Sequence, residues 1–241
     1  MPPRKYRLYF LLFCGTMLYF LANVQRVAIP GTVFNLLQER LQVSAPWITG
    51  LGSAFMYVYA LNQLAVGLLV ERYGGARVIV FGAAAFCAGS LLFPLSGSLL
   101  MLSFRRALTG LGASTLYLSL VQETIRMFRN GYAVLLSIII MIGYAGGIAA
   151  NAPFALGVER FGFDAVLYAA GGLALLFYLL FLLTRATLKP VPVRKVPLDF
   201  RCFAEVLKVR HNRDLFVFSG INFGLYYVLQ TVIGKKFLED W

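Results

Sequence analysis

Arg26 is the side chain with the clearest chemical potential in this 241-residue chain. It lies in Asn23-Val-Gln-Arg-Val-Ala-Ile-Pro30, inside the first of several long apolar segments. A cation at membrane depth costs about 2.5–3.5 kcal/mol even on lenient scales, so it must face a cavity or a partner. One interpretation is an anion clamp, because a guanidinium binds carboxylate or phosphate through two hydrogen bonds. The alternative is an arginine at the outer end of a shorter helix, with its head reaching the membrane interface.

Other polar side chains in apolar segments could share a cavity with Arg26. In the last apolar segment, Asn222, Tyr226 and Gln230 are spaced four apart and fall on one face of a helix. Such a stripe faces a bundle interior, where it either lines a substrate path or hydrogen-bonds neighbouring helices, and both alternatives stay open. The predicted substrate-binding residues are Arg26, Asn23, Tyr59, Gln63, Tyr144, Asn222, Tyr226 and Gln230.

None of the ten acidic residues lies in the middle of an apolar segment. A carboxylate buried there would have a raised pKa and could carry a proton, so this chain offers no proton-coupling site and no sodium site. His211 is the only histidine, and no Cys-x-x-Cys is present. With no Ser/His/Asp set and no phosphate loop, we predict no catalytic residue, no metal, no cofactor and no enzyme activity.

The elements that must position these side chains are long apolar helices. The chain is 60% hydrophobic and 13% charged, whereas a soluble domain is about half apolar and about a quarter charged. The excess forms blocks of about the 20 residues that a membrane-crossing helix needs. We predict an all-α polytopic membrane protein in which Pro94 and Pro153 kink their helices. The seven expected spans cover about 9 to beyond 29, 47–69, 77–98, 100–122, 131–156, 164–184 and 214–234.

Lysine and arginine are confined to alternate connections between these spans. Fifteen of them lie on one side, and before the seventh span the opposite side holds only Arg40 and Arg160. The positive-inside rule therefore predicts a multi-pass protein of the cell (inner) membrane with a cytoplasmic N-terminus. Topology explains the net charge of +12 better than nucleic-acid binding does. The expected partners are the lipid bilayer and a small molecule.

The chain contains nearly the same five residues twice. Residues 70–74 read Val-Glu-Arg-Tyr-Gly and residues 158–162 read Val-Glu-Arg-Phe-Gly. Three predicted crossings separate the copies, which places them on opposite faces of the bilayer. A repeat that is inverted in the membrane is typical of transporters built from related halves.

The segment Gly67-Leu-Leu-Val-Glu-Arg-Tyr-Gly-Gly-Ala-Arg77 resembles the loop 2–3 motif of the major facilitator superfamily, Gly-x-x-x-Asp-Arg-x-Gly-Arg-Arg. Gly67, Arg72 and Gly74 match, whereas Glu71 replaces the aspartate. Gly75-Ala76 replaces two basic residues, with Arg77 one place late. Three further segments resemble the family: Arg106-x-x-x-Gly110-x-Gly112, Glu123–Phe128 and Gly143–Pro153.

The resemblance implies twelve helices in two six-helix bundles. This chain would supply the first bundle with its three-plus-three inverted repeat (1–184), a basic cytoplasmic linker (185–213) and a seventh helix that begins a second bundle (214–241). We therefore expect a truncated sequence, which should not transport by itself, and a monomer at full length. The family also implies a latch at the cytoplasmic mouth, and the predicted gating residues are Gly67, Glu71, Arg72, Gly74, Arg77, Arg106, Glu123 and Arg126.

The resemblance also bears on function, because organic-anion and sugar-phosphate carriers of this family have an arginine in helix one placed like Arg26. We predict a permease, working as a symporter or antiporter by alternating access, for a small organic anion. The alternative is a transporter-like sensor that binds an anion and signals through a partner. In the linker, Phe200, Phe203, Leu207 and Arg210 recur at helical spacing, which predicts either an amphipathic helix on the inner leaflet or a solvated connector.

Overall fold

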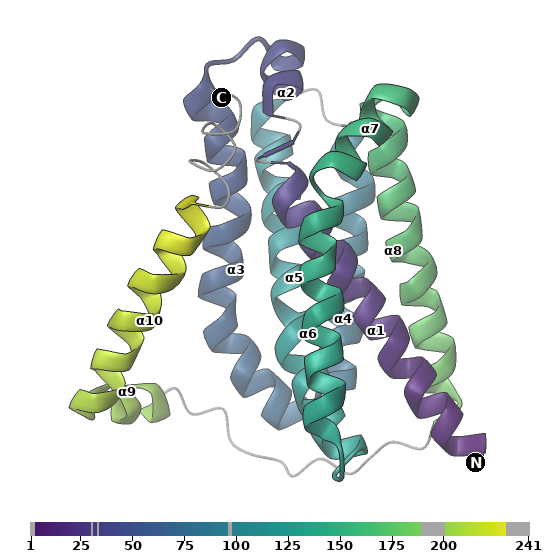
Figure 1. Cartoon of the computed structure of the whole chain (residues 1–241), viewed down its shortest axis with the longest axis vertical. Coiled ribbons are helices and arrows are strands. Elements are labelled where there is room, and N and C mark those ends of the chain that lie inside the picture. The colour runs from purple at the N-terminus through teal and green to yellow at the C-terminus, as the bar shows by residue number, and fades with distance from the viewer. Residues whose placement is uncertain (1–2, 30, 33, 96–97, 189–200, 230–241) are drawn as a thin grey trace. The chain divides into compact units, whose positions relative to one another are not determined.

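The computed structural model describes residues 3–29, 31–32, 34–95, 98–188 and 201–229, and every regular element among them is helical. The chain divides into two compact units, 1–196 and 197–241, which are described separately. The second unit holds α9 (Arg201–Lys208) and α10 (Arg210–Val228). The helices of the first unit are α1 (Pro3–Ala28), α2 (Phe34–Leu41), α3 (Ala45–Tyr73), α4 (Gly75–Leu92), α5 (Leu99–Met127), α6 (Tyr132–Ala149), α7 (Ala152–Phe161) and α8 (Phe163–Ala186) (Figure 1).

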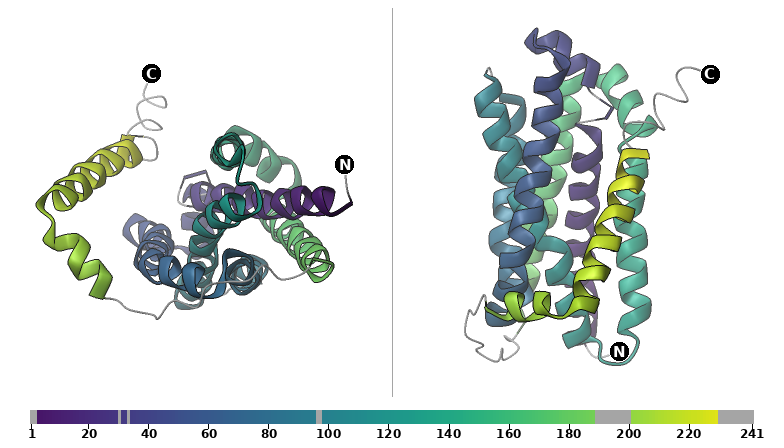
Figure 2. Two further views of the ribbon diagram at one scale, coloured as in Figure 1. Left: turned by 90° about the horizontal axis from the view of Figure 1, so that it is seen from below. Right: turned by 90° about the vertical axis from the view of Figure 1, so that its left-hand side faces the viewer.

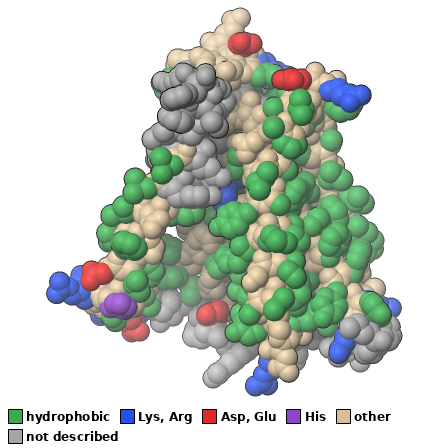
Figure 3. Space-filling model, in the orientation of Figure 1, with side chains coloured by type: hydrophobic (Ala, Val, Ile, Leu, Met, Phe, Trp, Pro, Cys, Tyr) green, Lys and Arg blue, Asp and Glu red, His purple; other side chains and the backbone are tan. Residues whose placement is uncertain are grey.

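Five of the described helices are long and apolar enough to cross a membrane: Lys5–Ala28, Pro46–Tyr73, Gly75–Leu95, Tyr132–Ala149 and Phe163–Ala186. Over α6 and α8, hydrophobic side chains cover the length of the bundle and charged ones gather near its ends (Figure 3). Exposed apolar residues such as Phe81, Ile148 and Leu183 belong to this belt. An apolar belt of this size suits contact with lipid.

The expected fourth span is a helix, but it is too polar to count among the five helices that are apolar enough to cross a membrane. α5 is 29 residues long, and its polar side chains turn inward. Arg106, Thr109, Ser114, Thr115 and Ser119 are all buried. The polar face of α5 therefore packs against neighbouring helices, while Leu100, Phe104 and Leu111 remain exposed, and the buried polar face explains why its composition differs from that of the other long helices.

The three-plus-three repeat is visible in the helix contacts. One half consists of α1, α3 and α4, and the other of α5, of α6 with α7, and of α8. α3 packs against α5 as α1 packs against α6, and α4 packs against α5 as α1 packs against α8. When the two halves are exchanged, the α3–α5 contact corresponds to the α6–α1 contact, and the α4–α5 contact corresponds to the α8–α1 contact. Figure 2 shows the long helices of this unit from two further sides.

The repeated five residues form the same turn in both halves. Gly74 has φ 84° and ψ 145°, and Gly162 has φ 85° and ψ 155°. Each glycine amide donates to the carbonyl four residues earlier, Val70 or Val158, at 2.9 Å, and a new helix begins one residue later. Only glycine adopts this backbone readily. The turns lie at opposite ends of the bundle, which we call the Gly74 end and the Gly162 end (Figure 1).

Several predicted boundaries were wrong, and proline explains them. α1 starts at Pro3 and ends at Ala28, because Ile29 precedes Pro30 and is pushed out of the helical conformation. The predicted 131–156 span is two helices, with Pro153 in the first turn of α7, where its missing N–H costs nothing. Pro94 likewise lies in a 3₁₀ turn, Phe93–Leu95, after α4. Both prolines separate elements and do not kink continuous helices.

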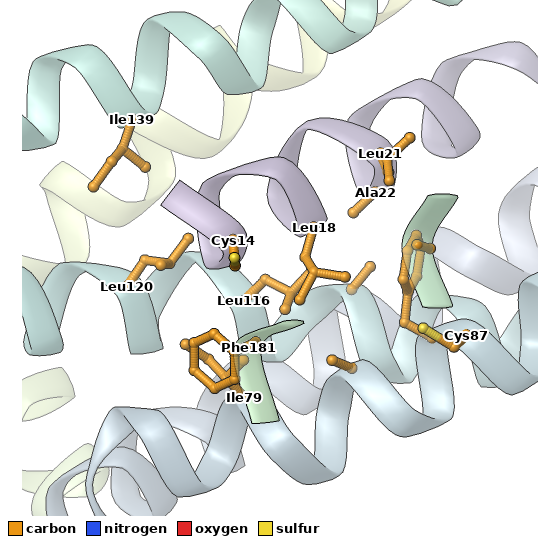
Figure 4. Packing of buried hydrophobic residues seen from close by; sticks show 14 of the residues in the cluster. Cys14, Leu18, Leu21, Ala22, Ile79, Cys87, Leu116, Leu120, Ile139 and Phe181 are labelled. Atoms are coloured by element: carbon orange, nitrogen blue, oxygen red, sulfur yellow. The ribbon is translucent and has the colours of Figure 1, made fainter. Parts of the chain in front are cut away.

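The core lies where α1 crosses α4, α5, α6 and α8. Leu18, Leu116 and Phe181 are almost completely buried there, beside the free Cys14 and Cys87 (Figure 4). Small residues allow the close approach, since a Cβ on Gly112 would lie 2.3 Å from Phe86 N. In a membrane, where lipid is as apolar as leucine, such packing is what holds helices together.

The linker was predicted to begin after residue 184 and to end at residue 213, but the neighbouring helices end and begin at other residues. α8 continues to Ala186, and α10 begins at Arg210, so helix replaces part of the expected linker. Residues 189–200 of the linker and the end of the expected seventh span beyond Leu229 lie outside the described residues.

Candidate functional site

Arg26 lies in the last turn of α1, yet its side chain is only half exposed. Its Nε is buried and has no hydrogen-bond partner among the described residues. A cation is favourable at a helix C-terminus, but an unsatisfied buried guanidinium nitrogen costs free energy unless something accepts its proton. The geometry combines the two sequence-based interpretations: Arg26 is at a helix end, and its side chain is directed into the protein.

A cluster of tyrosines surrounds Arg26. Tyr19 and Tyr59 both interact electrostatically with its guanidinium and with Tyr144. The ring of Tyr19 lies 5.6 Å from that of Tyr117, centroid to centroid. These residues come from α1, α3, α5 and α6, so the inverted halves both contribute.

Three other predicted binding residues lie with this cluster. Asn23 is buried one turn before Arg26, and its Nδ2 donates to the Tyr19 carbonyl at 2.9 Å. Gln63 interacts with Tyr59 and donates to the Ser114 carbonyl at 3.2 Å. Thus Arg26, Asn23, Tyr59, Gln63 and Tyr144 are brought together, although helix–helix hydrogen bonds occupy Gln63.

Arg106 lies with Arg26 and not with the other predicted gating residues. Its side chain is 1% exposed, its guanidinium lies 4.5 Å from the Phe55 ring centroid, and its Nη2 donates to the Arg26 carbonyl at 3.4 Å. The neighbouring Arg105 donates to the Leu92 carbonyl. Both arginines of α5 therefore bind carbonyls at helix C-termini, of α1 and α4, which lack partners within their own helices.

The Gly74 end is held by α5 side chains that cap α4. Gln122 Oε1 accepts from the Gly75 amide at 2.9 Å, and Glu123 Oε1 accepts from the Ala76 amide at 3.0 Å. Arg126 donates to the same Glu123 oxygen at 3.2 Å. A carboxylate at a helix N-terminus is favourable. A Cβ on Gly75 would lie 2.3 Å from the Ser119 carbonyl oxygen, which explains why a basic residue is absent at this position.

Among the remaining predicted gating residues, Gly74 is buried, whereas the others are more exposed than Glu123. Glu71 and Arg77 are exposed, and Glu71 has no ion pair within the described part of the chain. The Arg72 guanidinium lies 5.4 Å from the centroid of the Tyr73 ring. Gly67 has open space around it. Along α5, Glu123 is about 25 Å and Arg126 about 30 Å from Arg106, given a rise of about 1.5 Å per residue.

The Gly162 end has an ion pair that the sequence did not reveal. Arg40 of α2 donates to Asp164 in the first turn of α8 at 2.7 Å, and its guanidinium lies 5.6 Å from the Phe163 ring centroid. The Asp164 hydrogen bond raises the pKa of Arg40. The second copy of the repeat, which lacks a basic residue placed like Arg77, is thus followed by an ionic contact of its own.

Three predicted binding residues belong to the second unit. Asn222 is exposed on α10, Tyr226 lies within α10 and Gln230 lies outside the described residues. Among the residues that sequence reasoning missed, Tyr19 had a usable signal, because Tyr19, Asn23 and Arg26 at i, i+4 and i+7 share one helix face. Tyr117, Gln122 and the Arg40–Asp164 pair had none.

Comparison with known proteins gives one family. The model of the Major Facilitator Superfamily matches residues 9–237. A crystal structure of the peptide transporter POT in complex with alafosfalin superposes with a TM-score of 0.66 at 17% identity, and covers 94% of this chain and 47% of that chain. At this identity the likeness shows the fold alone.

The curated relatives match part of their own length. The chain is 29% identical over 133 residues to the voltage-gated purine nucleotide uniporter of Homo sapiens, covering 52% of this chain and 30% of that protein. It is 24% identical over 185 residues to the chloroplastic ascorbate transporter of Arabidopsis thaliana, covering 75% and 33%. It is 32% identical over 113 residues to the probable anion transporter 3 of the same plant, covering 46% and 21%. The chain spans about a third of the length of the first two relatives.

Proposed function

Because the chain belongs to the Major Facilitator Superfamily, a family of membrane transporters and not of enzymes, we propose that it forms part of a secondary transporter. The proposed substrate is a small organic anion, moved by alternating access between the two sides of the membrane. The proposed membrane is the cell membrane, with the Gly74 end on the cytoplasmic side, since the basic connections lie there.

The half-buried Arg26 is the observation that carries this proposal. Its buried Nε has no partner among the described residues, so an anion would satisfy a group that is otherwise costly to bury. Tyr19 and Tyr59 interact electrostatically with Arg26, and both interact with Tyr144, so the three tyrosines would offer hydroxyl donors to the same anion. Relatives named for a purine nucleotide, for ascorbate and for anions support this substrate class.

The proposed gate is the Gly74 end. Glu123 with Arg126 and Gln122 holds the start of α4, while Glu71 and Arg77 remain exposed for contact with a second bundle. An exposed ion pair is worth little by itself, but a bias of about 1–3 kcal/mol is enough to shift a two-state equilibrium. Residues 185–213 would connect the bundles, and the predicted stripe of Asn222, Tyr226 and Gln230 would face a bundle interior.

Anion binding can be tested by removing the charge of the ligand or the charge of Arg26, one at a time. The purified chain in lipid nanodiscs is titrated with adenosine monophosphate, with ascorbate and with adenosine, which keeps the purine but lacks the charge. We expect the anions to bind and Arg26→Ala to weaken them about 10- to 100-fold, the loss of one charged hydrogen-bonding group. Arg129→Ala removes an exposed arginine at the Gly74 end and serves as the matched control. Equal affinity in both variants would sink the proposal.

A further inference from the structure

α9 has two chemically different faces. Arg201, Glu205 and Lys208 recur at helical spacing on one face, and Phe203, Val206 and Leu207 occupy the opposite one. Val206 is 42% exposed and Leu207 is 50% exposed, so the described residues do not cover this part of the apolar face. A short helix with this division suits a boundary between an apolar and an aqueous phase.

The junction between α9 and α10 is a fixed corner. One residue, Val209, separates the helices, and its carbonyl accepts from the amides of Asn212 at 3.1 Å and Arg213 at 3.3 Å. The Asn212 side chain reaches back and donates to the Val206 carbonyl at 3.1 Å. The right-hand view of Figure 2 shows that α10 turns away from the line of α9. These bonds set the direction of α9 relative to α10.

α10 exposes large apolar side chains along its length. Phe216, Phe218, Ile221, Phe223 and Leu225 are each more than half exposed. A helix that exposes this many large apolar side chains belongs in lipid or inside a bundle. When α10 crosses the bilayer, as its predicted role requires, the corner at Val209 lays α9 along the membrane surface.

The charges around the corner complement an anionic surface. Arg201, Lys208, Arg210 and Arg213 outnumber Glu205 and Asp214, and Asp214 is already 3.9 Å from Arg210 in an ion pair. Each basic residue near a bilayer strengthens binding to anionic headgroups by a factor of about five. We propose that α9 lies in the interface of the membrane, with Phe203, Val206 and Leu207 among the acyl chains and its basic residues against anionic lipid headgroups.

Depth-resolved fluorescence on the full chain tests this placement. Cys202→Ser removes the thiol of α9, while Cys14 and Cys87 are buried and shielded. In this background, Leu207→Cys and Glu205→Cys carry an environment-sensitive dye on opposite faces. Ile221→Cys reports whether α10 is inserted. The vesicles contain phosphatidylcholine with or without phosphatidylglycerol, and lipids with a spin label near the headgroup act as quenchers.

We expect strong quenching at position 207, weak quenching at 205, and more quenching at 207 when phosphatidylglycerol is present. Replacing Arg201 and Lys208 by glutamine should lower the docking equilibrium at 207 about 25-fold, a factor of about five for each basic residue. Equal quenching at 205 and 207, or none at either, would show a solvated connector. A blue-shifted dye at 207 that lipid does not quench would show that protein covers this face. A dye at position 221 that stays in water would show that α10 is not inserted in the bilayer. Each of these results overturns the proposal.

Discussion

Replacing Gly162 by alanine measures the free-energy cost of the backbone conformation of one turn for a residue other than glycine. An added Cβ would meet nothing within 4 Å, so no clash contributes. The residue would still have to adopt φ 85° and ψ 155°, a region that is almost exclusive to glycine and costs other residues about 1–3 kcal/mol. For a chain of this size, each kcal/mol shifts the melting temperature by about 2–4 °C. We expect Gly162→Ala to melt roughly 2–12 °C lower.

Gly172→Ala provides a matched control in the adjoining helix. Gly172 lies inside α8, also with nothing within 4 Å of an added Cβ, but without a positive φ. Alanine is favoured over glycine in a helix by about 1 kcal/mol, so this variant should melt at the same temperature or slightly higher. The measurement is thermal unfolding of both variants in the same detergent. If both shift alike, backbone conformation at Gly162 is not the cause and the reasoning fails.

Four further results follow from the two ends of the bundle. Glu123→Ala should speed hydrogen exchange at the first amides of α4 more than Glu123→Gln does, because glutamine keeps an acceptor for Ala76 while alanine removes it; equal exchange in both variants would contradict the cap. The Arg40–Asp164 pair, with both side chains nearly half exposed, should give a coupling of only about 0.2–1 kcal/mol in a double-mutant cycle, weakened by salt. Since the folded pKa of Arg40 is raised, the share of this stability linked to its charge is present below its ordinary pKa and is lost only as pH rises through the higher folded pKa. Titration of Arg40 should therefore leave unfolding unchanged at neutral pH. Glu71→Gln should raise labelling of cysteines placed among the helices near the Gly74 end, and identical labelling in the parent protein would argue against the latch.

The periodic and local features could be predicted from the sequence. The two Val-Glu-Arg-aromatic-Gly segments indicated an inverted repeat, and both form the same glycine turn. The grouping of Arg26 with Asn23, Tyr59 and Tyr144 followed from the cost of polar groups in lipid.

The remaining features depend on contacts between distant segments. Arg40 and Asp164 are separated by 124 positions, and nothing in either local sequence identifies the partner. The α5 arginines bind carbonyls of α1 and α4, and that choice depends on how the helices are rotated and staggered. With thirteen tyrosines in the chain, composition could not single out Tyr117 as the neighbour of Tyr19. The break between α6 and α7 was predicted as a bend because proline allows both outcomes.

The inward-facing polar side chains of α5 have a consequence for how the protein is made. Segments enter a membrane from the translocon according to their own apolarity, and α5 carries Arg105, Arg106 and many hydroxyl groups through its length. Alone in lipid it would leave its two guanidinium groups unsatisfied, whereas its hydroxyl groups donate to carbonyls within α5. α1 and α4 supply the carbonyls that accept from the two arginines. The first half of the repeat is synthesised before α5 and thus acts as the template that admits α5 into the bilayer.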